Sequence, residues 1–285
     1  MPILGAHCSC AGGFARAFQR AREAGADSLQ IFTRAPSRWE ARPLEEAQVT
    51  GFRRAREEAG QPPVLAHDLY LTNLAAPDEE IRRRSLDSLA EEVLRCHRLG
   101  LDGLVCHLGA HMGAGEATGL ARFAEGLSEV LRRTRATGLP ILLETTAGQG
   151  TCLGHRFEHL AEVLCACRQD PRLGVCLDTC HVFAAGYDLA TGAGYRNTWR
   201  LFDAAVGRTR LRALHLNDSQ RERGSRVDRH ANIGHGTIGD AGFRRLLRDE
   251  SLAAVPMIVE TPESEVMHRA DLERLRRLAG KGPKP

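Results

Sequence analysis

Short apolar runs of strand length alternate with longer amphipathic segments along this chain. The runs lie at residues 3–6, 28–32, 64–66, 103–106, 141–143, 175–177, 211–214 and 257–259. Between them, segments such as 14–24 and 81–99 have helical periodicity, and Leu86, Leu89 and Val93 share one face of the second. Eight strand-then-helix repeats predict parallel strands joined by right-handed crossovers. The count favours an α/β fold of the closed (β/α)₈ barrel type, the TIM barrel, over an open doubly wound sheet. No Gly-x-Gly-x-x-Gly motif follows the first run.

No linker or low-complexity block interrupts this pattern, so we expect one barrel domain over residues 1–280 and a frayed tail at 281–285. No apolar run approaches the roughly 18 residues of a membrane helix, and the first residues do not resemble a secretion signal. The 9 cysteines are scattered, an odd number that indicates reduced thiols. We therefore expect a soluble, cytoplasmic, monomeric protein.

The charge is nearly balanced, with 39 Lys+Arg against 36 Asp+Glu and a net charge of +3. This excludes a polybasic or histone-like binder but allows a local basic face. The chain is poor in aromatic residues, at 5%, yet it has 12 His. Where these histidines lie is therefore informative.

Polar residues capable of chemistry follow almost every apolar run. In chain order these are His7, Thr33, His67, His107, Glu144, Asp178, His215 and Glu260. In a parallel barrel the carboxyl ends of all strands meet at one face, where active sites form. A single such residue is more often structural, but three carboxylates crowded together without a cation would repel one another. The pattern therefore predicts bound metal.

Two loops add further candidate ligands at the same face. His181 follows Asp178 by three residues, and Asp228 and His230 lie in the loop after the seventh run. Imidazole and carboxylate ligands suit Zn²⁺, with Mn²⁺ an alternative at one site and Fe²⁺ a weaker fit. Cys180 is a competing thiol ligand, whereas Cys176 alternates inward along its strand and is expected in the core.

Nine ligand candidates are too many for one tetrahedral ion and suit a cluster of about three. They are His67, His107, Glu144, Asp178, His181, His215, Asp228, His230 and Glu260. Closely spaced metal ions catalyse displacement at phosphorus, which favours phosphodiester hydrolysis.

Long motifs resemble those of the endonuclease IV family. They are Gly5-Ala-His-Cys-Ser-Cys-Ala-Gly-Gly13, Gln30-Ile-Phe-Thr33 to Trp39, His67-Asp-Leu-Tyr-Leu-Thr-Asn-Leu74, Leu143-Glu-Thr-Thr-Ala-Gly-Gln-Gly150, Val175-Cys-Leu-Asp-Thr-Cys-His-Val-Phe-Ala-Ala-Gly-Tyr-Asp188, His215-Leu-Asn-Asp-Ser219 and Gly224-Ser-Arg-Val-Asp-Arg-His230. The resemblance implies a zinc-dependent phosphodiesterase of the deoxyribonuclease IV type with three Zn²⁺ per chain. Its implied partner is double-stranded DNA containing abasic sites, cut 5′ to the lesion to leave a 3′-hydroxyl and a 5′-deoxyribose phosphate, with removal of 3′ blocking groups.

The resemblance also implies a ligand assignment. One zinc takes His67, His107 and Glu144, a second takes Glu144, Asp178, His215 and Glu260, and the third takes His181, Asp228 and His230. Glu144 bridges two ions, and Glu260 is our hypothesis for the residue that orients or deprotonates the attacking water. His7 and His111 are expected beside the ligands rather than on a metal.

The sequence departs from the family pattern in the segment Ala35-Pro36-Ser37-Arg38, where the family usually has Asn-Gln-Arg-Gln. The corresponding loop of relatives enters the DNA, so Arg34 or Arg38 is expected to substitute here. Thr145 also replaces the usual Asn, and His235 stands where an acidic residue is common.

Further DNA contacts are expected around the metal site. The loop at 220–230 has Arg221, Arg226 and Arg229 as candidate phosphate contacts, together with Arg223. Tyr70 is a candidate wedge or sugar-pocket residue. His97, His159 and His268 are expected on helix surfaces.

Three other functions are compatible with parts of the pattern. A sugar isomerase or epimerase would use the same barrel with about four ligands and one ion, and a UV-damage endonuclease would share both barrel and metals. A DNA-binding protein without catalysis is the third alternative, but it has little use for a complete ligand set.

Overall fold

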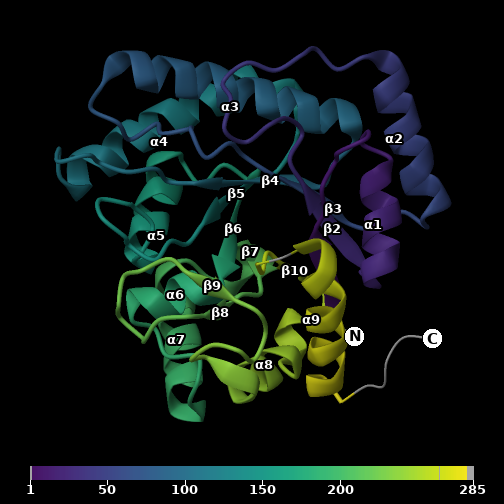
Figure 1. The fold of residues 1–285 in the computed structure, drawn as a ribbon. Coiled ribbons are helices and arrows are strands. Elements are labelled where there is room, and N and C mark those ends of the chain that lie inside the picture. The colour runs from purple at the N-terminus through teal and green to yellow at the C-terminus, as the bar shows by residue number, and fades with distance from the viewer. Residues whose placement is uncertain (1, 263, 281–285) are drawn as a thin grey trace.

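A computed structural model describes residues 2–262 and 264–280, so the predicted tail at 281–285 lies outside the described residues. Eight parallel strands close into a barrel in the order β1-β10-β7-β6-β5-β4-β3-β2 (Figure 1). The strands are β1 (Ile3–His7), β2 (Ser28–Ile31), β3 (Val64–His67), β4 (Gly103–His107), β5 (Ile141–Glu144), β6 (Leu173–Asp178), β7 (Leu211–His215) and β10 (Pro256–Val259). The predicted (β/α)₈ fold is confirmed.

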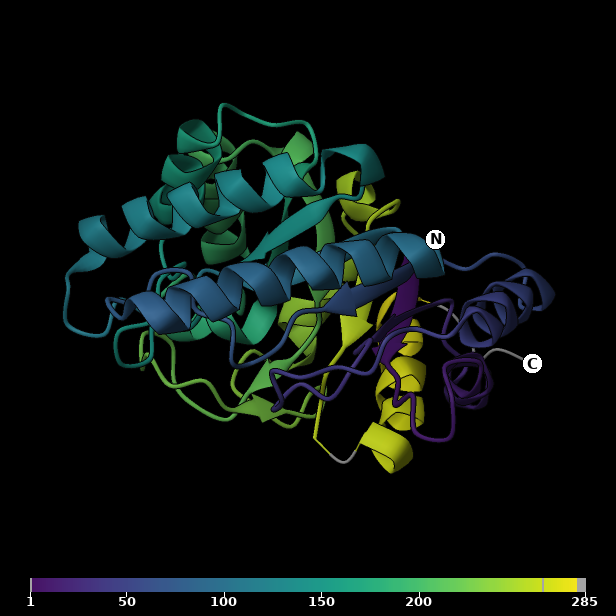
Figure 2. The same cartoon turned by 90° about the horizontal axis from the view of Figure 1, so that it is seen from above.

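Helices surround the barrel, as expected for right-handed crossovers between parallel strands. They are α1 (Arg16–Ala24), α2 (Glu46–Glu58), α3 (Glu79–Leu99), α4 (Glu116–Arg133), α5 (Phe157–Ala166), α6 (Thr179–Ala185), α7 (Gly192–Ala205), α8 (Gly239–Leu247) and α9 (Ser264–Leu278). Figure 2 shows α3 and α4 side by side along the outside of the barrel. α3 begins where the Asp78 side chain accepts a hydrogen bond from the Ile81 amide, and ends at Gly100, whose φ of 77° closes the helix.

The barrel interior contains a layer of small and medium apolar side chains. It consists of Leu65, Val105, Leu142, Cys176, Ala213 and Ile258, each at most 3% exposed. Gly5 and Ser28 pair in register between β1 and β2, and a Cβ on Gly5 would lie 2.3 Å from the Ser28 hydroxyl. Because side chains alternate along a strand, the residue two positions beyond each layer member also points inward.

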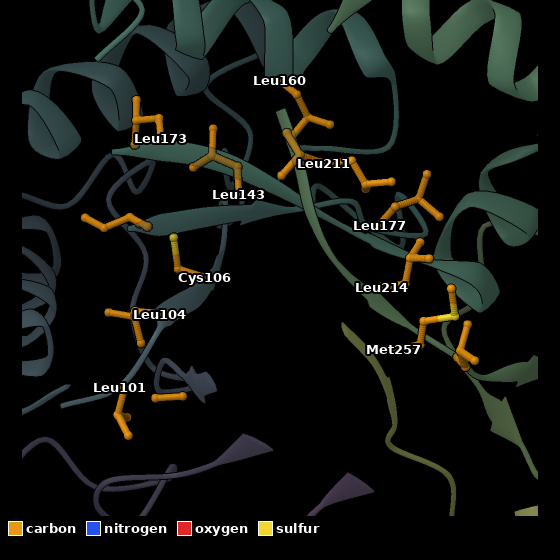
Figure 3. Packing of buried hydrophobic residues seen from close by; sticks show 14 of the residues in the cluster. Leu101, Leu104, Cys106, Leu143, Leu160, Leu173, Leu177, Leu211, Leu214 and Met257 are labelled. Carbon is orange, nitrogen blue, oxygen red and sulfur yellow. The ribbon is translucent and has the colours of Figure 1, made fainter. Parts of the chain in front are cut away.

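A second, larger core lies between the strands and the helices. Figure 3 shows part of it, where Leu104 and Cys106 of β4, Leu143 of β5 and Leu160 of α5 are buried together. The outward residues of the strands supply most of this core, so the strands are largely buried on both faces and read as mainly apolar runs, although Arg212 of β7 is exposed.

A short antiparallel pair, β8 (Asp218–Ser219) and β9 (His230–Ala231), was not predicted from the sequence. It joins the two ends of the arginine-containing loop, and the Gln220 amide donates to the Arg229 carbonyl at 3.0 Å. Among the described residues, no helix is long and apolar enough to cross a membrane.

Candidate metal centre

The predicted ligands on the strands form the next inward layer above the apolar interior. His67, His107, Glu144, Asp178, His215 and Glu260 each lie two positions after a member of that layer. They converge on a cavity of about 590 Å³, the mouth cavity, at the carboxyl ends of the strands. His67, His107, Glu144, His181, Asp228, His230 and Glu260 line it. A larger hollow of about 1380 Å³ lies beside α1 and α2 and contains none of these residues.

The first ligand group consists of His67, His107 and Glu144. The Glu144 Oε2 atom lies 3.1 Å from His67 Nε2 and 3.4 Å from His107 Nε2. Their ligand atoms all lie within 4.8 Å of one another. These are the three residues that the family resemblance implies for one ion.

The second group shares Glu144 with the first. His215 Nδ1 lies 2.8 Å from Glu144 Oε1 and 3.1 Å from Glu260 Oε2. Asp178 completes the set, with its Oδ2 atom 4.0 Å from the same nitrogen. Because Glu144 presents one oxygen to each group, it can bridge two ions.

The third group is supplied by α6 and by the loop that ends at β9. Asp228 places one oxygen 3.1 Å from His181 Nε2 and the other 3.3 Å from His230 Nε2. Cys180 forms a further set with Asp228 and His230 whose ligand atoms lie within 4.8 Å of one another, so it stays a competing ligand of this group. Its thiol lies 3.6 Å from the Arg229 carbonyl.

Hydrogen bonds from the opposite side of each ring fix which histidine nitrogen faces the ligand groups. His67 Nδ1 donates to the Asp68 carbonyl at 2.7 Å, and His181 Nδ1 donates to the Thr145 carbonyl at 2.8 Å. His230 Nδ1 lies 3.2 Å from the Glu260 carbonyl, which can only accept. The other nitrogen of each ring therefore faces the carboxylates, where a metal ion would bind it.

The electrostatics of the centre favour bound positive charge. Although burial opposes protonation, Glu144 and Glu260 raise the pKa of His67 to about 9. Asp178 and Asp228 raise the pKa of His230 to about 9, again against its desolvation. The Glu260 carboxyl is also buried, yet neighbouring histidines hold its pKa well below the usual range.

The residues present therefore fit metal ions. His181 Nε2 and His230 Nε2 lie 3.4 Å apart, and two lone pairs at that separation repel unless a proton or a metal ion lies near them. Glu144 and Asp178 are fully buried, so their charges need partners in the site. In the metal-free protein protons on histidine supply that positive charge, and metal ions would replace them.

Gln30 is a site residue that the sequence analysis missed. It is fully buried, its Nε2 donates to Glu260 Oε1 at 2.5 Å, and its Oε1 accepts from His215 Nε2 at 2.9 Å. The predicted run ended at Thr33, but β2 ends at Ile31 and the inward position is Gln30. Its signal was the two-residue alternation from Ser28.

Asn217 and Gln149 were also missed as positioning residues. Asn217 Nδ2 donates to Asp178 Oδ2 at 2.6 Å, and its Oδ1 accepts from the Glu260 amide at 2.9 Å. Gln149 accepts from the amide of Asp228 at 2.9 Å and so ties the third group to the loop after β5. Both residues lie in the motifs quoted above, but nothing in their spacing indicated these contacts.

Two predicted positions point away from the centre. Thr33 is buried against α3, where its hydroxyl donates to Glu92 and accepts from Arg95. The Arg34 side chain is only 3% exposed and donates to Glu92 Oε2 at 2.8 Å and to Ser88. We therefore withdraw Arg34 as a DNA contact, because its guanidinium is occupied by α3.

The remaining histidines fall into different environments. His7 Nδ1 lies 3.2 Å from Glu260 Oε1, beside the ligands as expected. His111 Nδ1 accepts from the Gly115 amide in the loop before α4, so its ring caps that loop, and it does not line the mouth cavity. His97 is exposed, but the surface prediction for His159 and His268 is wrong, since both rings are at most 4% exposed.

Aromatic and basic side chains surround the mouth cavity. Tyr70 is 68% exposed at its rim and packs against Phe32, while its amide donates to the Pro36 carbonyl. This hydrogen bond joins the Tyr70 loop to the segment containing Arg38, which is exposed. Exposed arginines of the 220–230 loop are Arg221, Arg223, Arg226 and Arg229, of which Arg223 is paired with Asp188 and Arg229 lines the cavity.

The chain is similar to known proteins in both sequence and fold. The family described as "Xylose isomerase-like TIM barrel" matches residues 18–278. A probable endonuclease 4 of Chloroflexus aurantiacus is 48% identical over 280 residues, covering 98% of each chain, and one of Geobacter sulfurreducens is 46% identical, covering 95% and 94%. The crystal structure of endonuclease IV from Thermus thermophilus superposes with a TM-score of 0.88 at 37% identity, covering 98% and 99%. A D-tagatose 3-epimerase-like protein, at 17% identity and a TM-score of 0.71, shares the fold alone.

Proposed function

Since this chain belongs to the endonuclease IV family, we propose that it hydrolyses the phosphodiester 5′ to abasic sites in double-stranded DNA. The products would be a 3′-hydroxyl and a 5′-deoxyribose phosphate, and the same chemistry would remove 3′ blocking groups. The observation that carries the proposal is the convergence of nine ligands in three adjoining groups, two of which share Glu144.

We assign three Zn²⁺ ions to these groups. His67, His107 and Glu144 would hold one, Glu144, Asp178, His215 and Glu260 a second, and His181, Asp228 and His230 the third, with Mn²⁺ an alternative at one of them. When bound, the ions would stabilise negative charge on the phosphoryl oxygens and on the leaving alkoxide.

Glu260 is the candidate general base. Its carboxyl lines the mouth cavity, and His215 and His7 hold its pKa well below the usual range against desolvation, so it is ionised at neutral pH and can accept a hydrogen bond from a water molecule. Gln30 and His7 contact Oε1 and restrict how the group can turn. The carboxylate would thus orient or deprotonate a water molecule for attack on phosphorus.

DNA would approach along the exposed rim of the cavity. Tyr70 presents a ring that can wedge into the base stack or line the sugar pocket, and Arg38, Arg221, Arg226 and Arg229 are the candidate phosphate contacts. We expect the protein to act as a monomer, because all nine ligands come from one chain.

An oligonucleotide duplex with one abasic site tests the proposal. The expected result is a cut 5′ to the lesion with a 3′-hydroxyl end, abolished by a chelator and restored by Zn²⁺. An unsaturated aldehyde at the 3′ end would indicate a lyase and refute hydrolysis. A nick beside a photoproduct without one at the abasic site would favour the UV-damage alternative, and about one metal per chain would favour the isomerase alternative.

The Glu260→Gln variant tests the base. We expect abasic-DNA binding close to that of the wild type and a loss of turnover, because the amide cannot accept the proton. An active variant would remove this role from Glu260.

A further inference from the structure

A second cluster of potential ligands lies outside the metal centre. Glu116 opens α4, His155 lies in the loop after β5, and His159 is in the first turn of α5 (Figure 1). Glu116 Oε1 lies 3.5 Å from His155 Nε2, and Glu116 Oε2 lies 3.4 Å from His159 Nε2. Their ligand atoms are all within 4.8 Å of one another. None of the three lines the mouth cavity.

His155 has a nitrogen that the fold leaves without a hydrogen bond. Its ring is 5% exposed, and Nδ1 donates to the Cys152 carbonyl at 3.2 Å, which leaves a lone pair on Nε2. That Nε2 atom is buried and has no hydrogen bond to any part of the chain that the structure describes. An imidazole anchored through one nitrogen to a backbone carbonyl, with the other aimed at a carboxylate, has the arrangement of a metal ligand.

A cation already occupies the space between the other two residues. Arg156 Nη2 lies 3.1 Å from Glu116 Oε2 and 2.9 Å from His159 Nε2, and the arginine side chain is 53% exposed. The cluster therefore attracts positive charge, and the guanidinium can leave towards solvent. A compact metal ion could contact all three ligand atoms, whereas the guanidinium bonds only two of the residues.

Binding at His159 has a cost. The Gly154 amide donates a hydrogen bond to His159 Nδ1 at 3.1 Å, and Arg156 donors face His159 Nε2. Because a neutral imidazole has only one lone pair, one of its nitrogens carries a proton and cannot accept. A metal ion on Nε2 places the proton on Nδ1 and removes the Gly154 hydrogen bond.

We propose that Glu116, His155 and His159 bind one Zn²⁺ ion at a site separate from the centre at the mouth cavity. Two imidazoles and one carboxylate are a known zinc ligand set that leaves a fourth position open. Because the lost Gly154 bond and the competing arginine oppose binding, the ion binds more weakly here than in the mouth cavity. It would fasten the start of α4 to the loop after β5, the loop whose Gln149 holds Asp228.

Counting bound zinc tests the site directly. The full chain is stripped with a chelator, titrated with ZnCl₂ and examined by native mass spectrometry. We expect His155→Phe to bind one ion fewer than the wild type at saturation, and His97→Phe, a matched change of an exposed histidine, to bind the wild-type number. The number of bound zinc ions does not depend on which reaction the mouth cavity catalyses, so this test is independent of the proposed nuclease function.

Two further variants separate a metal site from a simple ion-pair cluster. Glu116→Gln alters a side chain that is 39% exposed, so it should fold, and it should lose the same ion. Arg156→Ala removes the competing cation and should tighten this one site about tenfold, the equivalent of one charge-assisted hydrogen bond. Equal zinc counts for the wild type, His155→Phe and Glu116→Gln would overturn the proposal, as would weaker binding by Arg156→Ala.

Discussion

Gln30 offers a sharp test of how the metal centre is held. Replacing it by Leu keeps a buried side chain of similar size but removes the 2.5 Å bond to Glu260 Oε1 and the 2.9 Å bond to His215 Nε2. A hydrogen bond to a charged group contributes about 1.5–3 kcal/mol, and its loss leaves a buried partner unsatisfied. With the tautomer of His215 no longer fixed, we expect a loss of about 10- to 100-fold in zinc affinity or incision rate, as for partners of metal ligands in general.

The measurements are zinc affinity by chelator competition and incision of abasic duplex at saturating zinc. Gln19→Leu on the exposed face of α1 is the matched control and should match the wild type in both. Circular dichroism would confirm that the variant is folded. A folded Gln30→Leu variant whose zinc affinity and incision rate both lie within about twofold of the wild type would contradict the positioning role of Gln30. Such a change is well short of the loss expected for a partner of a metal ligand.

Three other changes follow from contacts described above. Arg34→Met should lower the free energy of unfolding in urea by about 3 kcal/mol, because it leaves the buried Glu92 without its closest cation; an unchanged midpoint would contradict this. Arg229→Ala should reduce the slope of log K against log salt for abasic DNA by about 0.9, measured by fluorescence anisotropy, and an equal slope would show that it touches no phosphate. In chelator, the pKa values of His67 and His230 are raised to about 9 from 6.5. Protonation of these two histidines stabilises the folded protein fully below pH 6.5, and this contribution is lost as pH rises through 9. The free energy of unfolding of the metal-free protein in urea should therefore fall between pH 6.5 and 9, and a rise would refute the raised pKa values.

The strands and the residues following them could be predicted because each element has a periodic signal. The strands are largely buried on both faces, so their apolar runs are visible in the sequence. Two positions after each of the six interior apolar residues the sequence has His, Asp or Glu. Thr33 shows the limit of this reasoning. The end of an apolar run does not show whether a residue points into or out of the barrel, because side chains alternate along a strand. In β2 the inward residue lies before the end of the run, at Gln30.

Some features of the structure have no periodic signal in the sequence. β8 and β9 have two residues each, too few for any periodicity, and their pairing depends on the fold around them. His268 shares a helical face with the buried Leu272 and Leu275 at spacings of four and seven, so its burial does have a signal in the sequence. Contacts such as Asn217 with Asp178 depend on tertiary geometry and cannot be read from spacing.

The order of the ligands along the chain has a consequence for how this protein matures. The second ligand group unites β5, β6, β7 and β10, and the barrel closes only when β10 pairs with β1. During synthesis, a nascent chain that has not yet released β10 from the ribosome has neither Glu260 nor a closed ring of strands. Under the proposed function, the second ligand group is complete only once β10 has joined the barrel, so a chain that ends before Glu260 should lack both this metal site and incision activity.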